Sequence, residues 1–254
     1  MNYRIAVQTD IGSTRPANED SICVKKGHFN GVPVVLAAVC DCMGGLDKGG
    51  LASATVAKSL SRWYEEKLPA MLEDCNWQII KQSIEDLADK LNRQIGRYGE
   101  SSRLRLGTTL CAMLIIGDGY ILINVGDSRA YLMSNGVRQL TKDQTFVQRE
   151  LDRGTLTPEQ VRTHPKRNVL LQCIGASKQI SPEISCGSIM KGESYLLCTD
   201  GFRHYITNEE LYSMFGQYGD VSEEDMQKEI DRAISLVMQR GEKDNITAVI
   251  IRAV

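Results

Sequence analysis

The stretch PVVLAAVCDC, residues 33–42, decides the fold, because seven apolar residues from Val34 to Cys40 run directly into the carboxylate of Asp41. An uninterrupted apolar run rich in Val and Ala is typical of a strand that is buried on both faces. We therefore expect Asp41 at the edge of the core, where a charge is costly unless a cation lies beside it. The glycine-rich residues that follow contain a single Lys, so the partners of Asp41 must come from elsewhere in the chain.

The composition indicates a globular protein with one large core. The 254 residues are 42% apolar and 24% charged, and we expect a single domain over residues 1–254. The formal net charge of −2 does not favour a nucleic acid or an anionic membrane as the main partner. The sequence begins without the apolar segment of a secretory signal, and its apolar runs are far shorter than the ~20 residues that span a bilayer. Eight Cys lie mostly in apolar segments, as reduced core thiols do, so these observations together predict a cytoplasmic protein.

Apolar runs bounded by Gly, Asp or Asn predict most of the strands. They lie at residues 3–9, 20–25, 33–40, 108–116, 119–125, 129–133, 194–199 and 245–251. The Asn135-Gly136 pair lies between two strand-like segments and predicts a type I′ hairpin.

Helical patterns lie between the groups of strands. An apolar stripe with helical spacing predicts an amphipathic helix over residues 78–95, and a second helix is expected at about 48–65. Residues 143–175 are irregular, with two short helical pieces, and we expect them to form an excursion over the surface. Helices and strands do not alternate regularly, which favours an α+β fold in which antiparallel sheets carry helices on their outer faces. Two capping-box patterns predict helices near the end of the chain, Thr207 with Glu210 and Ser222 with Asp225.

Acidic residues recur where strands begin or end. They are Asp41, Asp127 in YILINVGDSR, Asp200 in SYLLCTDGF, Asp244 in GEKDNITAVII, and Glu19 with Asp20 in RPANEDSICV. Each one alone is explained by the preference of Asp and Gly for turns. If the strand ends converge, however, two carboxylates about 5 Å apart repel by roughly 3 kcal/mol, so several together need divalent cations. Oxygen ligands without nearby His favour Mg²⁺ or Mn²⁺, and the lone C-x-C pair of Cys40 and Cys42 is a poor zinc pattern.

Seven short motifs give the sequence a family resemblance. In chain order they are RPANED, DCMGG, GTT at 107–109, GDSR at 126–129, RNVLLQCIG, LLCTDGF and DNIT. Together they resemble the metal-dependent serine/threonine protein phosphatases of the type 2C family, particularly the small stand-alone bacterial ones, from Arg15 to Thr247. The resemblance implies a four-layer αββα sandwich, with two antiparallel β-sheets flanked by helices and a metal site at one edge. The excursion at 143–175 would be the family's flap.

The resemblance also implies which residues bind metal. Asp41 is similar to the carboxylate that bridges two ions, and Asp200 and Asp244 are similar to the terminal ligands of the first ion. The second ion would be held by Asp41, by the main-chain carbonyl of Cys42 and, through water, by Glu19. The cofactor would thus be Mn²⁺ or Mg²⁺, as two or three ions.

Two further residues complete the implied site. Asp127 is similar to the residue that, with Asp200, forms a third and weaker metal site, and Arg15 matches the arginine that holds the substrate phosphate. A planar guanidinium can bind two phosphate oxygens at once. Two ions that share a water lower its pKa, so a bridging hydroxide could attack phosphoserine or phosphothreonine without a phosphoenzyme. The expected catalytic residues are Arg15 and Asp41, and the expected partners are phosphorylated proteins, including a serine/threonine kinase and its substrates in bacterial signalling.

Three residues depart from the family pattern. Cys42 stands where the family usually has Gly, Met43 where many eukaryotic members have a His that protonates the leaving group, and Gln144 where a His is common. A metal-bound water would then have to protonate the leaving alcohol.

Other functions remain open. The chain could be a catalytically inactive relative that binds phosphoproteins, although all four expected ligand aspartates are present. It could also hydrolyse a small phosphate ester or nucleotide, although its glycines lack the GK[ST] ending of a P-loop. Within the excursion, His164 is either a substrate-facing residue or a loop residue, and the excess of Arg and Lys over residues 138–167 marks either a docking surface for acidic phosphopeptides or a solvated loop.

Overall fold

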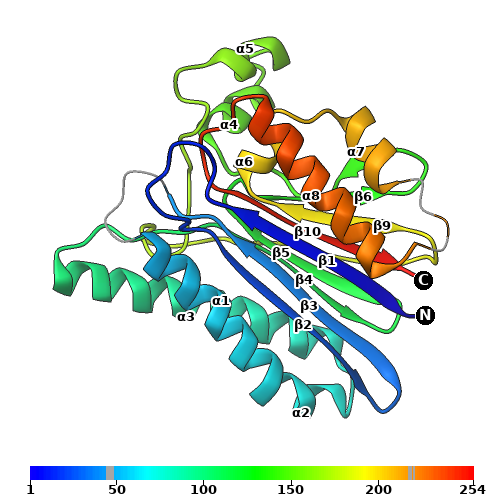
Figure 1. The fold of residues 1–254 in the computed structure, drawn as a ribbon. Coiled ribbons are helices and arrows are strands. Elements are labelled where there is room, and N and C mark those ends of the chain that lie inside the picture. Colours follow the sequence, from blue (N-terminus) through cyan, green and yellow to red (C-terminus); the bar gives the residue numbers. More distant parts are fainter. Residues whose placement is uncertain (44–48, 217–218, 220) are drawn as a thin grey trace.

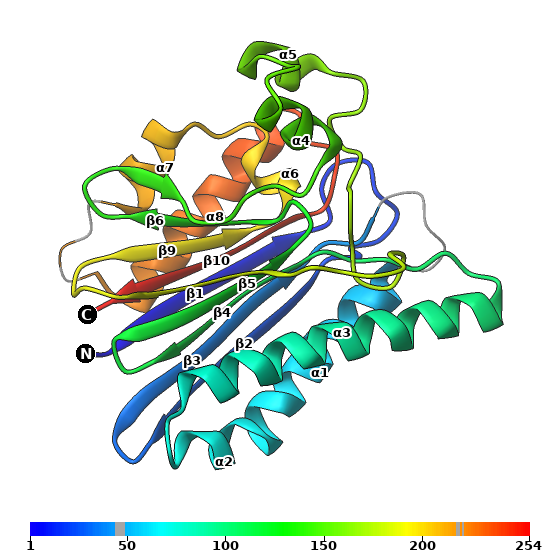
Figure 2. The ribbon, with the colours of Figure 1, turned by 180° about the vertical axis from the view of Figure 1, so that it is seen from behind.

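The computed structural model describes residues 1–43, 49–216, 219 and 221–254. Within these residues, two five-stranded antiparallel sheets pack face to face, and helices cover both outer faces (Figures 1 and 2). This is the α+β fold that the sequence patterns predict and, in detail, the four-layer αββα sandwich that the family resemblance implies. In the first sheet the order is β1 (Tyr3–Asp10), β10 (Ile246–Ala253), β9 (Ser194–Cys198), β6 (Arg129–Met133) and β7 (Val137–Gln139). In the second it is β2 (Ser21–Phe29), β3 (Val32–Cys40), β4 (Leu110–Ile116), β5 (Gly119–Val125) and β8 (Glu183–Ser188).

The helices form the outer layers and one end of the molecule. Helices α1 (Gly49–Glu66), α2 (Leu68–Leu72) and α3 (Trp77–Ser102) lie over the second sheet, and α7 (Asn208–Phe215) and α8 (Glu223–Gln239) lie over the first (Figure 1). The short helices α4 (Phe146–Asp152), α5 (Pro158–Thr163) and α6 (Asp200–Arg203) gather at the end of the sandwich where β3 ends and β10 begins. Among the described residues, no helix combines the length and the apolar character needed to cross a bilayer.

Strand β3 shows why an unbroken apolar run is needed. Alternate residues of β3 contribute to two different cores, since Leu36 and Ala38 pack against the α1 and α3 layer, while Ala37 and Val39 pack between the two sheets. All four are fully buried. The strand is therefore buried on both faces, as the sequence predicts, and it ends at the edge of both cores.

The predicted turn at Asn135-Gly136 is a hairpin of a different type. Met133 pairs with Val137, so three residues rather than two form the loop. Gly136 has a φ of 138°, but Asn135 is not among the described residues with positive φ. The pair of positive φ values that a type I′ turn requires occurs instead at Asn30-Gly31, with φ of 50° and 79°, directly between β2 and β3. Loop length thus decides the turn type, and the Asn-Gly pair alone does not.

The predicted helices form with small changes at their ends. Helix α3 extends beyond residues 78–95 in both directions, from an Asn76 N-cap to Arg103 in the left-handed conformation. The predicted start of the second helix at residue 48 lies outside the described residues, and α1 is described from Gly49. The capping box at Thr207 is confirmed. At Ser222 the hydroxyl accepts the Asp225 N–H, but the Asp225 carboxylate bonds to that hydroxyl rather than to the main chain, so only half of the box forms.

Candidate functional site

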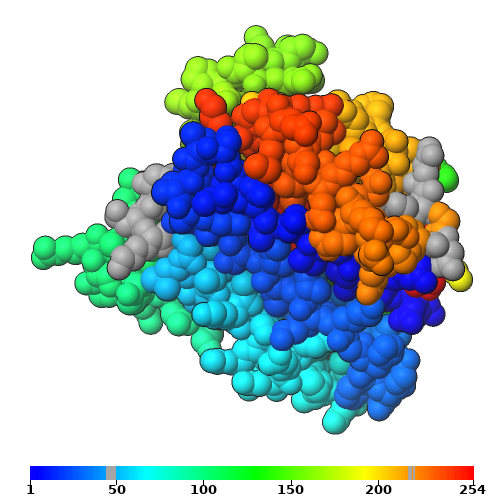
Figure 3. Space-filling view, viewed as in Figure 1, coloured from blue at the N-terminus to red at the C-terminus, as the bar shows by residue number. Residues whose placement is uncertain are grey.

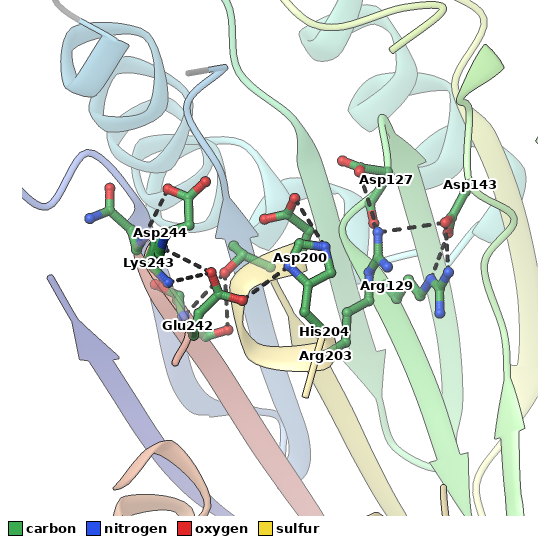
Figure 4. Close-up of polar contacts among 12 residues, drawn as sticks. Asp127, Arg129, Asp143, Asp200, Arg203, His204, Glu242, Lys243 and Asp244 are labelled. Atoms are coloured by element: carbon green, nitrogen blue, oxygen red, sulfur yellow. Dashed lines mark hydrogen bonds and ion pairs between the residues drawn. The ribbon is translucent and has the colours of Figure 1, made fainter. Parts of the chain in front are cut away.

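The acidic residues that the sequence singles out lie at the end of the sandwich described above. Asp41 follows β3, Asp127 lies in the turn between β5 and β6, Asp200 begins α6, and Asp244 lies in the turn before β10. Figure 4 shows Asp244, Asp200 and Asp127 one after another along this end, with Asp143 beyond them. The topology thus brings acids that are far apart in the sequence to one edge of the two sheets.

A glycine and a threonine bring the Asp127 turn next to Asp41. Gly126 has a φ of 109°, and a Cβ there would lie 2.6 Å from Cγ2 of Thr109. Thr109 in turn holds the main chain of Asp41, since its hydroxyl accepts the Asp41 N–H at 2.9 Å and its own N–H donates to the Asp41 carbonyl at 2.8 Å. Only Gly permits both this backbone conformation and this close approach.

A second glycine brings α6 against the turn before β10. A Cβ at Gly201 would lie 2.2 Å from the main-chain oxygen of Asn245 and 3.5 Å from Cβ of Asp244. Asp200 directly precedes this contact. Sequence reasoning treats the glycines of the GDSR and TDGF motifs only as turn residues. The structure shows that a larger side chain at either position would clash with a neighbouring segment of the site.

The pKa values of the carboxyl groups reflect their burial first and the charges of their neighbours second. Burial and the carboxylates of its neighbours, first Asp20 and then Asp200, raise the pKa of Asp41 well above its usual range. Burial raises the pKa of Asp20 to about 7, although two threonine hydroxyls that donate to it oppose the shift. Burial and the charge of Asp200 raise the pKa of Asp127 to about 7 as well. The acids therefore repel one another in a poorly hydrated place, as the sequence analysis expects if the strand ends converge.

Arg15, the predicted phosphate-binding residue, lies on one of the acids. Its Nε and Nη2 each donate to an oxygen of Asp244 at 2.7 Å, as a bidentate pair. The side chains of Arg15 and Asp244 remain 36% and 32% exposed, so this pair borders solvent. Arg15 therefore lies at the acidic edge, and its guanidinium forms an ion pair with Asp244 there.

Glu19 and Cys42 lie close to each other, Cys42 just after β3 and Glu19 beside the start of α1. A side-chain hydrogen bond to Glu19 contributes to the raised pKa of the Cys42 thiol, behind burial and the charges of Glu19 and Asp41. The Glu19 carboxylate also accepts the Gly50 N–H at 3.4 Å. A buried thiol with a raised pKa is a poor nucleophile at neutral pH. The assignment of the Cys42 carbonyl as a ligand stays a prediction.

Two of the residues that depart from the family pattern have structural contacts. The side chain of Gln144 accepts the Gly126 N–H at 2.7 Å, and its main-chain N–H donates to the Gly126 carbonyl at 2.9 Å. Gln144 therefore holds the turn that carries Asp127. The Met43 N–H donates to the Gly107 carbonyl at 3.2 Å, and the Met43 Sδ lies 3.1 Å from where a Cβ of Gly107 would be.

Sequence reasoning missed a second layer of charged residues around the acids (Figure 4). Arg129 binds Asp143 through two contacts of 2.7 Å, and Arg203 reaches the Asp127 carboxylate at 3.3 Å. His204 lies between Asp200, at 3.6 Å, and the Glu242 carboxylate, at 3.0 Å. One of these charged residues, Arg129, could have been identified from the sequence, because it is the last residue of the GDSR motif. His204 follows the TDGF motif and is expected at a helix start or at the rim of the site, and Asp143 directly precedes Gln144, but no local pattern indicates which residues they pair with.

A cleft opens beside these residues. It has a volume of about 1660 Å³, and its lining includes Arg15, Asp127 and Asp244 together with residues 161–163, 167 and 168 of the excursion. In Figure 3 the excursion, in yellow-green, projects at the same end of the molecule as the red segment near residue 240. The cleft is large enough for an extended polar ligand that reaches the acidic edge.

The donor chemistry at this edge fits hard divalent cations. The expected side-chain ligands are all oxygen donors, and Oδ1 of Asp20 is buried without a hydrogen-bond partner in the described part of the chain. Burial, and after it the charges of the neighbouring carboxylates, raise the pKa values of Asp41 and Asp20, and a cation beside these groups would oppose both effects. Among residues 1–43, 49–216, 219 and 221–254, however, no three Asp, Glu, His or Cys side chains form a group already arranged to hold an ion. The individual ligand assignments therefore stay predictions.

Comparisons with known proteins agree with the motifs. The family model described as protein phosphatase 2C matches residues 17–235. The chain is 30% identical to the serine/threonine phosphatase stp of Listeria monocytogenes serovar 1/2a over 247 residues, which are 96% of this chain and 93% of the relative. It is also 30% identical to the serine/threonine protein phosphatase PstP of Mycobacterium tuberculosis over 97% of this chain, but it spans only 44% of the length of PstP.

Solved structures are similar over nearly the whole chain. The serine/threonine phosphatase Stp1 from Staphylococcus aureus aligns with a TM-score of 0.86 and 26% identity, over 100% of this chain and 96% of that one. The catalytic domain of PstP in complex with two manganese ions aligns with a TM-score of 0.75 and 28% identity, over 98% and 97% of the two chains.

Proposed function

The chain belongs to the protein phosphatase 2C family, and on this premise we propose that it hydrolyses phosphoserine and phosphothreonine in proteins, with Mn²⁺ or Mg²⁺ as cofactor. The observation that carries the proposal is the gathering of acids from four separate segments beside a cleft that an arginine also lines. A phosphate monoester is an anion, and carboxylates alone would repel it. Such a site suits phosphate only if cations lie between the acids and the substrate.

The acids have a defined role in this proposal. Asp41, Asp200 and Asp244 would hold the two ions, together with the Cys42 carbonyl and, through water, Glu19; the third and weaker site at Asp127 is what the family resemblance alone implies. When bound, these ions would supply the charge that shields the phosphate and lowers the pKa of a bound water.

Arg15 would bind the phosphate itself. Its guanidinium lines the cleft and already forms a bidentate pair with a carboxylate, whose geometry a phosphate shares. Because the guanidinium stays protonated, it can carry part of the charge that develops on the phosphate oxygens. Thr108 and Thr109 would keep Asp41 in place, since both bond to its main chain.

The cellular setting is part of the proposal. Relatives with the names of serine/threonine phosphatases support phosphorylated proteins as substrates, and we propose a serine/threonine kinase and its targets among them. Eight free cysteines suit a reducing compartment, so we propose that the protein acts in the cytoplasm. We further propose that residues 1–254 work as one catalytic domain, with the excursion at 143–175 as its flap.

A direct assay tests the proposed function. The purified protein should release phosphate from p-nitrophenyl phosphate and from phosphoserine and phosphothreonine peptides when Mn²⁺ or Mg²⁺ is present. Activity should disappear in excess EDTA and in an Asp41→Asn variant that keeps the parent melting temperature. A panel of phosphotyrosine peptides and nucleotides separates a protein phosphatase from a small-ester hydrolase. Full activity in EDTA would reject the metal-dependent mechanism.

A further inference from the structure

A buried arginine lies on the carboxylate that the resemblance assigns to the third metal site. Nη2 of Arg203 is 3.3 Å from Oδ2 of Asp127 and also 3.3 Å from the main-chain oxygen of the same residue. A longer contact of 3.6 Å joins it to Asp143. The three side chains are only 14%, 9% and 9% exposed, so little water separates these charges.

The charge of Arg203 is available to Asp127 because Asp143 has a closer partner. Arg129 donates to both oxygens of Asp143 at 2.7 Å, and its third nitrogen donates to the hydroxyl of Tyr131 at 2.9 Å. Asp143 is thus neutralised by Arg129. Of the two arginines, Arg203 is the one whose charge is left to balance Asp127.

The position of Arg203 ties it to the metal centre. It is the last residue of α6, the same helix that begins with Asp200, and it reaches Asp127 from there. A divalent cation at Asp127 would therefore lie against a fixed positive charge. Since a guanidinium does not lose its proton in proteins, this repulsion cannot be relieved by titration. Poor hydration also leaves the repulsion weakly screened.

We infer that Arg203 is a built-in counter-ion that takes the place of the third metal ion at Asp127. The chain would then bind two ions at its acidic edge, and Arg203 would supply the positive charge beside Asp127. Asp127 would then hold Arg203 in place and would not bind a metal ion. This inference rests on the proposed function, because it assumes a metal centre at this edge.

Counting bound Mn²⁺ tests the inference. Equilibrium dialysis at pH 8 with rising free Mn²⁺, followed by metal analysis, gives the number of ions per chain. The parent protein should reach two ions, and Arg203→Met, which keeps the bulk of the side chain but removes its charge, should reach one more. Arg203→Lys keeps the charge and should match the parent. Arg162→Met is the matched control, because it removes an exposed cation that lines the same cleft from α5, and its count should equal that of the parent.

A double variant locates the additional ion. Combining Arg203→Met with Asp127→Asn should return the count to that of the parent. Arg203→Gln is a second neutral variant, and the count is taken from whichever of the two has a cooperative thermal transition. A parent that already binds three ions, or a folded neutral variant with the parent count, would overturn the inference while leaving the phosphatase intact. A parent with neither bound Mn²⁺ nor phosphatase activity would overturn the proposed function and the inference with it.

Discussion

Replacing Gly201 with Ala tests whether close packing of α6 against the turn before β10 sets the geometry of the site. The new Cβ would lie 2.2 Å from the main-chain oxygen of Asn245, whereas ordinary contact begins near 3.4 Å. The two segments would have to separate by about 1.2 Å, because backbone cannot rotate away as a flexible side chain does. Asp200 lies on one of these segments and Asp244 on the other, so the same movement separates two predicted ligands.

The expected losses follow from that displacement. Overpacking of this kind costs about 1–3 kcal/mol, which for a domain of this size lowers Tm by roughly 2–12 °C. A misplacement of about 1 Å in an active site lowers the rate on the order of 100-fold. Thermal unfolding and kcat for p-nitrophenyl phosphate with Mn²⁺ measure the two effects. Gly219→Ala is the matched control, since no atom of the described residues lies within 4 Å of its Cβ position and its backbone needs no positive φ. A Gly201→Ala protein with the parent Tm and a kcat within about twofold of the parent would refute the reasoning.

Three further outcomes are expected. Arg15→Ala should raise KM for a phosphothreonine peptide by about tenfold, because the guanidinium binds the phosphate directly, and an unchanged KM would remove Arg15 from the site. In metal-free protein, the folded-state pKa values of Asp20 and Asp127 are about 7 and exceed the unfolded value of ~4, so the folded state binds more protons. The stabilisation from these two groups is present below about pH 4 and is lost as the pH rises through about 7, so Tm in EDTA should fall between pH 5 and pH 8. Asp20→Asn should weaken this dependence, and a Tm that rises over the interval would contradict it. Arg129→Met should destabilise the fold by about 3–5 kcal/mol, since it leaves the buried carboxylate of Asp143 without its bidentate partner. Adding Asp143→Asn should recover part of that loss in urea unfolding, and strictly additive effects would argue against the pairing.

Local patterns predict the parts of this molecule that depend on local physics. The continuous apolar run of β3 predicts burial on both faces, and the structure places its alternate residues in two cores. Helix α3 follows from its apolar stripe, because one face must pack on a sheet. The short strand β8 was not predicted, since its residues are only partly buried and the strand carries little apolar signal.

The charged pairs around the acids depend on the fold and could not be predicted in the same way. Arg203 and Asp127 are 76 residues apart, and nothing near either residue indicates that α6 will end beside the turn between β5 and β6. The bond between Gln144 and the Gly126 N–H, with its partners 18 residues apart, shows the same limit. A sequence motif can identify a functional carboxylate, but the residue that pairs with it depends on how helices and strands pack in the fold.

The question raised by Asp41 is which cation lies beside a carboxylate at the end of a buried strand. Among the described residues, arginines pair with the outer acids, Asp244 and Asp127, but no ion pair is formed by the carboxylates of Asp41 and Asp20. Thr109 bonds to the main chain of Asp41 and adds no charge. Burial therefore raises the pKa values of Asp41 and Asp20, and no arginine in the described part of the chain pairs with them to oppose this increase. These two carboxyl groups would gain most from a divalent cation. Because ion binding and proton binding then relieve the same repulsion, Mn²⁺ should raise Tm more at pH 8 than at pH 5, and an equal increase at both values would place the ion elsewhere.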